Sequence, residues 1–437
     1  MTSPDSWQHL CQAIRRANPC RRSGHLLQVS GSVLMASLPG ARVGERVRVG
    51  SAELPADIIG FNRHQAVLLP AGDCSQLASG DTVAARGETF ALRFSENLTG
   101  RVIDARGRPL DGRGGLGPTV SVSVDFDPPH PLHRSPVEQV LETRIKSIDC
   151  LATIGRGQRL GLFAEPGVGK STLLAQLARN CQADVVVLAL VGERGREVRE
   201  FIERDLGPRG RQRTVVVCAT SDRPAAERSR AVPVATAIAA AFRRRGLAVL
   251  LLVDSLTRHA RACREIALAA GEIPGQRGFP PSVIDGLSRL LERAGNDERG
   301  SVTAIYTVLT EGAAEDDPLA EEIRSLLDGH LVLSRGLAQA GVFPALDPGR
   351  SLSRLMSGLA DDAQRNLARR ARLVWSAYRQ NHEALEFGLY QRGGDAQLDR
   401  LLDTYPRLLD WMRQAPDQGC SRAQALHTLA GVLGELP

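Results

Sequence analysis

A glycine-rich segment flanked by apolar stretches, residues 155–172, constrains the fold of this chain more than any other feature. The apolar run at 160–163 predicts a buried strand, and leucines at helical spacing from Leu173 onwards predict a helix. The turn between them ends in Gly-Lys-Ser at 169–171, which fits the Walker A arrangement of strand, phosphate loop and helix. The segment therefore predicts an α/β fold that holds a phosphate group at the start of a helix.

Each position of this loop suits a phosphate ligand. Gly167 and Gly169 let the backbone turn its N–H groups toward an anion, beside the positive end of the helix dipole. Lys170 would reach the β- and γ-phosphates of ATP, and the hydroxyl of Ser171 would hold Mg²⁺. We predict ATP and Mg²⁺ as cofactors, with the nucleotide contacted by Gly167, Val168, Gly169, Lys170, Ser171 and Thr172.

The loop also departs from the full pattern, so a chance glycine-rich turn is the alternative. Ala164 stands where the pattern has glycine, and Glu165 and Pro166 bring an acid and a residue without an N–H donor. The use of lysine argues for the phosphate site. Among 55 Lys and Arg residues, the only lysines are Lys146 and Lys170. A compact ammonium fits among phosphate oxygens where the planar guanidinium of arginine does not.

Composition narrows the functional classes. With 437 residues and 43% hydrophobic content, the chain has room for two or three globular domains. A net charge of +6 is weak support for nucleic-acid binding, and 4% aromatic residues leave few stacking platforms for single strands. Eight cysteines without a Cys-x-x-Cys pair favour reduced thiols. Without a signal core or an apolar run of about 20 residues, we expect a cytoplasmic protein that docks at a membrane.

The residue pattern changes twice in the first third of the chain. Residues 2–18 carry apolar side chains at helical spacing, which suits either a partner-binding helix or a frayed terminal helix. Short alternating runs broken by turn residues then predict a small β-barrel without obvious chemistry. The runs are 26–33, 46–49, 66–69, 82–84 and 90–94. A strand and turn at 100–112 and a proline-rich linker lead out of this region.

From about residue 141 the pattern alternates between strands and helices. The predicted strands are 160–163, 185–191, 214–218, 248–253 and 302–308. This alternation predicts a parallel, doubly wound sheet, whose ligands lie at the carboxyl ends of the strands. After about residue 354 amphipathic segments at 363–378 and 398–414 predict a helical cap.

Two acids follow predicted strands. Asp254 directly follows the strand predicted at 248–253. In nucleotide-binding proteins an acid at this position holds the water shell of Mg²⁺, although an acid after a strand can also cap the next helix. Glu193 follows the strand at 185–191 and could polarise the water that attacks the γ-phosphate, or could be a solvated surface acid. The acidic residues at 311–317 favour an exposed loop over a metal site, and the arginines at 243–245 favour a helix end.

Seven segments together resemble the ATPases of type III protein secretion systems, with the flagellar export ATPases and the catalytic subunits of rotary ATP synthases as further relatives. The segments are 144–149, 155–172, 191–200, 254–264, 271–281, 307–312 and 328–356. Among them are Gly-Glu-Arg-Gly-Arg-Glu-Val at 192–198 and Asp-Ser-Leu-Thr-Arg at 254–258. The resemblance covers the chain from about residue 100 to 356.

The resemblance implies a RecA-like P-loop core with an N-terminal barrel and a C-terminal helical domain. The implied regions are 1–22, a tail for a stator protein; 23–96, a barrel with ring contacts; 97–355, the ATPase domain; and 356–437, helices that dock chaperones and substrates. The working form would be a homohexamer, with a central stalk protein in the pore faced by the loop at 271–281. The ring would lie against the export gate at the cytoplasmic face of the inner membrane, without nucleic acid.

The resemblance also implies roles for individual residues. Glu193 would activate the hydrolytic water, and Phe343 would pack on adenine. Arg194 and Arg258 would line the phosphate site. Arg354 would reach into the neighbouring subunit's site as an arginine finger, which can raise a rate by about 10³–10⁵.

These inferences predict an ATP-driven motor that releases chaperones from exported proteins and helps unfold them. A flagellar export ATPase is the alternative within the family. A hexameric RNA helicase of the transcription-termination type would need a more aromatic barrel. A non-catalytic nucleotide-binding ring subunit would lack the carboxylate that Glu193 supplies.

Overall fold

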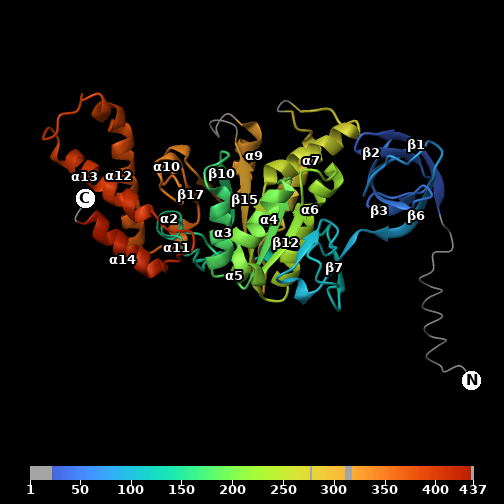
Figure 1. Ribbon diagram of the computed structural model, residues 1–437, viewed down its shortest axis with the longest axis horizontal. Helices are drawn as coiled ribbons and strands as arrows, with labels where there is room; N and C mark the ends of the chain where they lie inside the picture. Colours follow the sequence, from blue (N-terminus) through green and yellow to red (C-terminus); the bar gives the residue numbers. More distant parts are fainter. Residues whose placement is uncertain (1–21, 276–277, 311–316, 435–437) are drawn as a thin grey trace, which may run out of the picture.

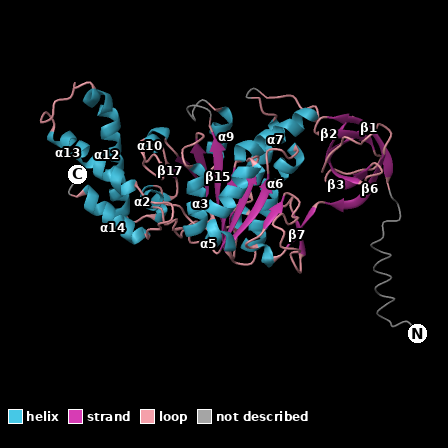
Figure 2. Ribbon diagram, viewed as in Figure 1, coloured by secondary structure: helices cyan, strands magenta, loops and turns pink. Residues whose placement is uncertain are grey.

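A computed structural model describes residues 22–275, 278–310 and 317–434. Three regions follow one another along its longest axis: a β-barrel, a mixed α/β core and a group of C-terminal helices (Figures 1 and 2). This architecture confirms the predicted fold class. The segment expected to be helical at 2–18, the acids at 311–316 and residues 276–277 of the expected pore loop lie outside the described residues.

The barrel closes from six antiparallel strands in the order β1-β2-β5-β4-β3-β6. They are β1 (Ser23–Ser30), β2 (Val33–Ser37), β3 (Glu45–Val49), β4 (Leu54–Asn62), β5 (Gln65–Pro70) and β6 (Thr82–Thr89). Alternate side chains such as Val47 and Val49 are buried in its interior, as strand geometry requires. The run expected as one strand at 26–33 is wrong in one respect, because the chain reverses at Gly31, with φ of 53°, and forms two strands.

A connecting segment follows the barrel. The run expected at 90–94 is β7 (Ala91–Phe94), which pairs with β9 (Val120–Ser123) in a separate two-stranded sheet rather than in the barrel. Between them β8 (Val102–Asp104) joins the edge of the core sheet beside β12. Two short 3₁₀ turns belong to the same part of the chain, η1 (Glu96–Leu98) and η2 (Pro131–His133).

The core sheet has the order β17-β16-β10-β15-β13-β11-β12-β8, with β14 paired to β15. The strands are β10 (Arg159–Ala164), β11 (Val185–Val191), β12 (Thr214–Ala219), β13 (Ala248–Asp254), β14 (Gly295–Asn296), β15 (Ser301–Leu309), β16 (Gly329–Val332) and β17 (Leu352–Ser353). The pairs from β16 to β8 are parallel, whereas β14 and β17 are antiparallel. All five predicted core strands are present.

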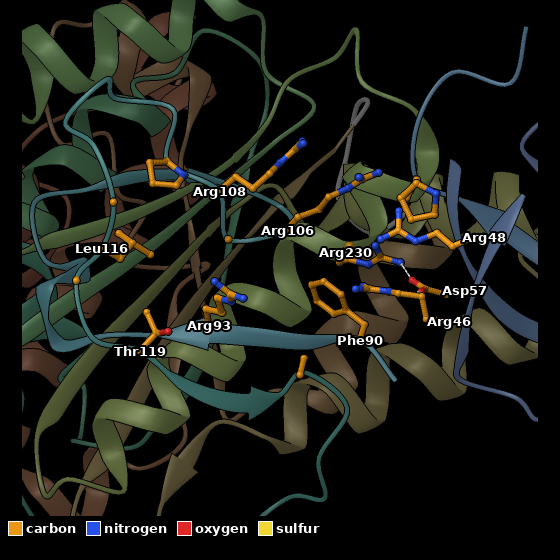
Figure 3. A pocket seen from close by; sticks show the side chains of 17 residues that line it. Arg46, Arg48, Asp57, Phe90, Arg93, Arg106, Arg108, Leu116, Thr119 and Arg230 are labelled. Atoms are coloured by element: carbon orange, nitrogen blue, oxygen red, sulfur yellow. Dashed lines mark hydrogen bonds and ion pairs between the residues drawn. The ribbon is translucent and has the colours of Figure 1, made fainter. Parts of the chain in front are cut away.

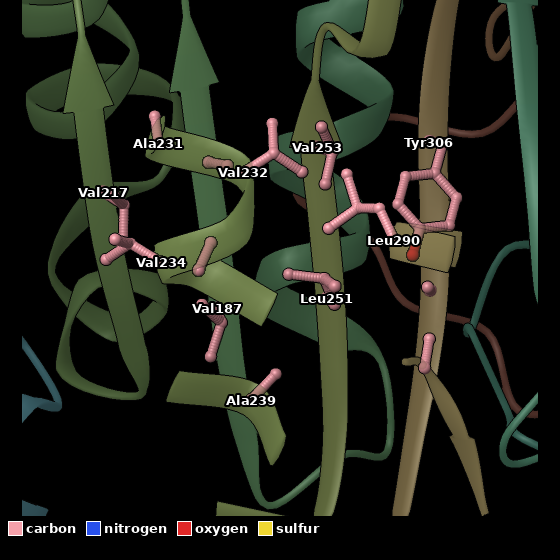
Figure 4. Packing of buried hydrophobic residues seen from close by; sticks show 14 of the residues in the cluster. Val187, Val217, Ala231, Val232, Val234, Ala239, Leu251, Val253, Leu290 and Tyr306 are labelled. Atoms are coloured by element: carbon pink, nitrogen blue, oxygen red, sulfur yellow. The ribbon is translucent and has the colours of Figure 1, made fainter. Parts of the chain in front are cut away.

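Both faces of this sheet are buried. In β11 the side chains of Val187 and Ala189 pack in one hydrophobic cluster, and those of Val186 and Leu188 pack in the cluster on the opposite face. Figure 4 shows α6 (Ala225–Arg243) laid against the first of these faces. Strands buried on both sides read as continuous apolar runs, which is why the sequence pattern identified them.

Helices cover the sheet and extend beyond it. Those of the core are α2 (Lys146–Leu151), α3 (Lys170–Asn180), α4 (Gly195–Glu200), the π-helical turn η3 (Phe201–Asp205), α5 (Gly207–Gln212), α6, α7 (Leu256–Ala269), α8 (Pro281–Glu292), α9 (Pro318–Leu326), α10 (Arg335–Gln339) and α11 (Met356–Leu359). The C-terminal helices are α12 (Asp362–Glu386), α13 (Ala396–Met412) and α14 (Arg422–Leu433). In the described parts of the chain, no helix combines the length and apolar content needed to cross a bilayer.

The C-terminal helices are joined to the core through α2. Lys146 donates from Nζ to the carbonyl oxygen of Arg413 at 2.9 Å, and its ammonium lies 5.7 Å from the ring centroid of Trp411. The side chain of Gln414 donates to the carbonyl oxygen of Arg144 at 2.7 Å and accepts from the backbone N–H of Lys146 at 2.9 Å. One of the two lysines therefore lies in this junction.

A buried carboxyl group, Asp149, organises the same junction. Its oxygens accept from the N–H and the hydroxyl of Thr143 at 2.9 and 2.7 Å and from the N–H of Arg144 at 2.9 Å. Gln364 of α12 donates to the Asp149 carbonyl oxygen at 2.9 Å. Burial raises the pKa of Asp149 to about 7, although the three donors oppose the rise.

Candidate active site

The loop between β10 and α3 has the backbone conformation that anion binding needs. Gly167 and Gly169 have φ angles of 82° and 90°, in the left-handed region that glycine adopts without a steric penalty. Val168 between them is buried and fixes the loop to the core. Ser171 and Thr172 are exposed in the first turn of α3, where the unpaired N–H groups of a helix end point at the loop.

Three charged side chains from separate motifs converge beside this loop. Lys170 Nζ forms an ion pair with Asp254 Oδ1 and lies 3.6 Å from Glu193 Oε1. Thr307 of β15 donates its hydroxyl to Asp254 Oδ1 at 2.9 Å. The side chains meet because β10, β11, β13 and β15 are parallel and their carboxyl ends share one edge of the sheet.

Glu193 has the surroundings of a reactive carboxyl group. Its pKa is raised above the ordinary value, first by burial and then by the neighbouring charge of Asp254, while Lys170 and Arg258 oppose the rise. Arg258 Nη2 lies 3.3 Å from Glu193 Oε2. Glu193 Oε1 is buried and, among the described residues, has no hydrogen-bond partner. A buried acceptor without a donor can take a proton from a water molecule, as a general base must.

The donor atoms at the loop also suit Mg²⁺. The carboxylate of Asp254 and the hydroxyl of Ser171 are hard oxygen ligands, which this cation prefers. Within the described part of the chain, no group of three His, Cys, Asp or Glu side chains is arranged to hold a metal. A Mg²⁺ ion at Ser171 and Asp254 would therefore take its remaining ligands from phosphate oxygens and water, which is its usual mode of binding in nucleotide sites.

Among the expected arginines, Arg258 joins the cluster and Arg194 does not. A Cβ atom at Gly192 would lie 2.8 Å from Arg258 Cδ, so glycine leaves the room that the Arg258 side chain occupies. The side chain of Arg194 is 80% exposed and pairs with Glu197 at 3.3 Å. Within one chain, then, Arg258 faces the Glu193 carboxyl group and Arg194 does not.

Arg354 lies at the opposite edge of the sheet. It is exposed, directly after β17, and its N–H donates to the carbonyl oxygen of Asp328 at 3.1 Å. The N–H of Asp328 in turn donates to Arg159 at the first residue of β10, at 2.9 Å. Arg354 is therefore at the amino ends of the strands, whereas the phosphate loop of the same chain is at the carboxyl ends.

Phe343 stands beside the phosphate loop. Its side chain is 41% exposed, and its ring carbons lie 3.3 Å from where a Cβ atom on Gly169 would be. An exposed aromatic face at this distance offers a flat apolar surface to a planar base.

The acid at Glu165, which departs from the usual loop sequence, has a cation facing it. Arg335 at the start of α10 lies 3.8 Å from the Glu165 carboxylate, with both side chains partly exposed. Such a pair is screened by solvent, so it reduces rather than abolishes the negative charge near the loop.

Sequence reasoning did not assign three residues that take part in this geometry, namely Gly192, Thr307 and Arg335. Thr307 had a usable signal, because it is a polar residue near the carboxyl end of a buried strand. Gly192 and Arg335 had none, because their roles depend on where side chains from other elements lie.

Two family models match the chain. The nucleotide-binding domain of the ATP synthase alpha/beta family matches residues 144–353, and the C-terminal domain of the type III secretion ATPase EscN matches residues 360–431. The chain is 47% identical over 414 residues to the SPI-2 type 3 secretion system ATPase of Salmonella typhimurium, covering 95% of both chains. It is 40% identical over 435 residues to the flagellum-specific ATP synthase of Bacillus subtilis, covering 98% of this chain and 99% of the relative.

A solved structure has the same architecture. The assembled ATPase EscN of the enteropathogenic E. coli type III secretion system superimposes with a TM-score of 0.90 at 38% identity, over 94% of this chain and all of that one. EscN in complex with its central stalk EscO gives a TM-score of 0.86 over the same share of each chain. These likenesses exclude the RNA helicase alternative. The chain belongs to the family of type III secretion and flagellar export ATPases, and it is an ATPase.

Proposed function

We propose that this chain is the ATP-hydrolysing motor of a type III protein secretion system, which releases chaperones from exported proteins and helps unfold them. The observation that carries the proposal is the convergence of Lys170, Glu193 and Asp254 beside the phosphate loop. The higher identity to the secretion relative supports secretion over flagellar export. A flagellar export ATPase is the second candidate, since that relative matches over nearly its whole length.

The side chains at the loop divide the work of hydrolysis. The ammonium of Lys170, now paired with Asp254, would bind the β- and γ-phosphate oxygens of ATP. Glu193 Oε1 would accept the proton of the attacking water, and Arg258 would hold the Glu193 carboxylate in position. Mg²⁺ held by Ser171 and Asp254 would neutralise charge on the phosphates. Phe343 would pack against adenine, and the loop N–H groups from Gly167 to Thr172 would cradle the phosphates.

We further propose that the working form is a homohexameric ring in which Arg354 completes the site of the neighbouring chain. Support comes from EscN, which was solved in an assembled form and with a central stalk, and from the exposed position of Arg354 away from its own phosphate loop. Arg194, which is also exposed, would then face phosphate only in the assembled ring.

The remaining partners follow from the same proposal. Residues 1–22 would bind a stator protein, the barrel at 23–96 would make ring contacts, and the ATPase domain at 97–355 would enclose a stalk. The helices at 356–437 would dock chaperones and exported substrates, with the ring held peripherally at the export gate on the cytoplasmic face of the inner membrane.

The test uses a purified complex of a secretion chaperone and its cargo from the same cells. With ATP and Mg²⁺, the chain should release the cargo, measured by size-exclusion chromatography. Glu193→Gln should bind the complex without releasing it. Glu200→Gln, which changes an exposed acid at the end of α4 that pairs with Arg196 at 3.7 Å, is the matched control and should release cargo normally. ATP consumption without release by the unaltered chain would overturn the chaperone proposal and leave the ATPase assignment intact.

A further inference from the structure

A cavity lies between the barrel and the core, away from the phosphate loop. Its volume is about 620 Å³, within the range of small-molecule sites (Figure 3). Barrel strands β3 and β4 form one wall, the segment around β7 and residues 106–119 form another, and α6 of the core contributes a third. A molecule in this cavity would touch both domains.

The cavity is lined by guanidinium groups. They belong to Arg46, Arg48, Arg93, Arg106, Arg108 and Arg230 (Figure 3). Asp57 is the one acidic side chain in the lining, and it is already shared, at 3.3 Å with Arg46 and in a second ion pair with Arg230. Arg108 pairs at 2.6 Å with Asp104, which lies outside the lining. The six arginines of the lining still exceed the charge that these two carboxylates neutralise.

Two of the arginines hold buried donors without acceptors. The side chain of Arg106 is 16% exposed, and its nearest carboxylate, that of Glu227, is 3.9 Å away and equally close to Arg223. Among the described residues, Nε and Nη2 of Arg106 and Nε of Arg48 are buried without a hydrogen-bond partner. Burial lowers the pKa of Arg106, and the nearby Arg108 and Arg230 add to this effect while Glu227 opposes it. A buried charged donor without an acceptor raises the free energy of the folded chain. An anion bound there would supply the acceptor and lower that free energy.

The cavity wall is also held in place before any ligand arrives. The guanidinium groups of Arg46 and Arg230 lie over the ring of Phe90, 4.8 and 4.7 Å from its centroid. Elsewhere on the contact between barrel and core, barrel residues Val67 and Leu69 pack with Ile266 of α7 in one buried cluster. Binding groups that are already ordered cost less entropy on binding than free surface arginines do.

We propose that this cavity is a second ligand site, distinct from the phosphate loop, for a compact inorganic polyphosphate anion. Phosphate groups present several charged acceptors in a small volume, and each matches the fork of a guanidinium group. The anion would contact Arg48 of the barrel and Arg106 and Arg230 of the core at once. Binding would therefore fix the orientation of the barrel on the ATPase core.

The experiment is isothermal titration calorimetry with inorganic triphosphate, without metal, on full-length chain carrying Lys170→Ala so that the phosphate loop contributes little. One triphosphate should bind per chain, at least about tenfold more weakly after a further Arg106→Gln or Arg48→Gln change, because each removes a charge-assisted contact. Arg86→Gln, in an exposed β6 arginine outside the cavity that pairs with Glu53 at 3.0 Å, is the matched control and should bind unchanged.

Three results would overturn the proposal: triphosphate binding unaffected by both cavity substitutions, the same weakening in Arg86→Gln, or equal binding of citrate at matched ionic strength. If circular dichroism shows that Arg106→Gln fails to fold, Arg48→Gln at the cavity rim decides the outcome. Because the measurement uses a background that does not hydrolyse ATP, its failure would leave the motor proposal untouched.

Discussion

Asp149 is buried and Glu193 is partly buried, and both carboxyl groups have raised pKa values, but their hydrogen bonding differs. The oxygens of Asp149, on α2, accept from three donors on Thr143 and Arg144, in the segment directly before that helix. Glu193 instead faces Lys170 and Arg258 from other elements and, in the described chain, keeps one oxygen without a hydrogen bond. A carboxyl group satisfied by its sequence neighbours fixes structure, whereas one with an open oxygen beside cations is available for chemistry.

The largest effect should come from removing Arg354, the residue proposed to complete the Glu193 site of the neighbouring chain. Arg354→Ala should lower ATP turnover by about 10³–10⁵, because an arginine finger stabilises the transition state. Mixing Arg354→Ala with Glu193→Gln chains should restore part of the steady-state ATPase rate, since one interface in the mixture has both groups intact. Turnover that stays at the level of the separate variants at every mixing ratio would contradict action between chains.

Glu193→Gln alone should lower turnover by about 10²–10⁴, the usual contribution of a general base. ATP binding and the midpoint of thermal unfolding should stay near those of the unaltered chain, because the lost carboxylate holds no backbone donor in place. Fluorescence titration with an ATP analogue measures the binding, and scanning calorimetry measures the unfolding midpoint. Glu200→Gln, at an exposed acid of α4, is the control, and a normal ATPase rate in Glu193→Gln would assign catalysis elsewhere.

At Asp149, the substitution Thr143→Val should lower stability and leave the ATPase rate unchanged, the reverse of Glu193→Gln. The substitution removes the hydroxyl that donates to Asp149 at 2.7 Å and accepts from the N–H of Ile145 at 3.2 Å. The free energy of unfolding in urea should fall by about 1–3 kcal/mol, with the ATPase rate per folded chain preserved. A large loss of rate without a loss of stability would show that Asp149 is more than structural.

The smallest effect concerns pH. Glu193 must be ionised to accept a proton, so the ATPase rate should rise with pH through its raised pKa. Arg258→Gln removes a cation that lowers this pKa, so the acid limb of the rate profile should move to higher pH. Arg199→Gln, whose side chain is exposed and paired with Glu203 at 3.0 Å, should leave the limb in place. A limb that moves equally in both variants would contradict the contact with Arg258.

How far the fold follows from sequence depends on strand length and burial. The five long core strands are continuous apolar runs because both faces are covered, and β11 is predicted to its first and last residue. The expected core strands omit β16, since a strand of four residues carries too little pattern. A strand was predicted within 100–112, but its pattern did not show that β8 joins the core sheet beside β12. The turn at Gly31 was missed because the apolar residues on either side, such as Leu26 and Val33, resemble one continuous strand.

Some residues of the site could likewise be predicted from the sequence, and others could not. Lys170, Glu193 and Asp254 each follow a strand, so topology alone brings them to one edge of the sheet. The direction of Arg194 depends on a local rotamer and on Glu197, which spacing does not specify. The arginine cavity could not be foreseen either, because its lining runs from Arg46 to Arg230 and exists only once the barrel packs on α6.

The two lysines have a practical consequence. One lies at the phosphate loop and the other in the junction between α2 and the C-terminal helices, and every other basic side chain of comparable strength is arginine. An amine-reactive reagent therefore has two side-chain targets, each reporting on a different region. Shielding of Lys170 would record nucleotide occupancy, and modification of Lys146 would record release of the C-terminal helices, so one mass-spectrometric footprint could follow both events during turnover.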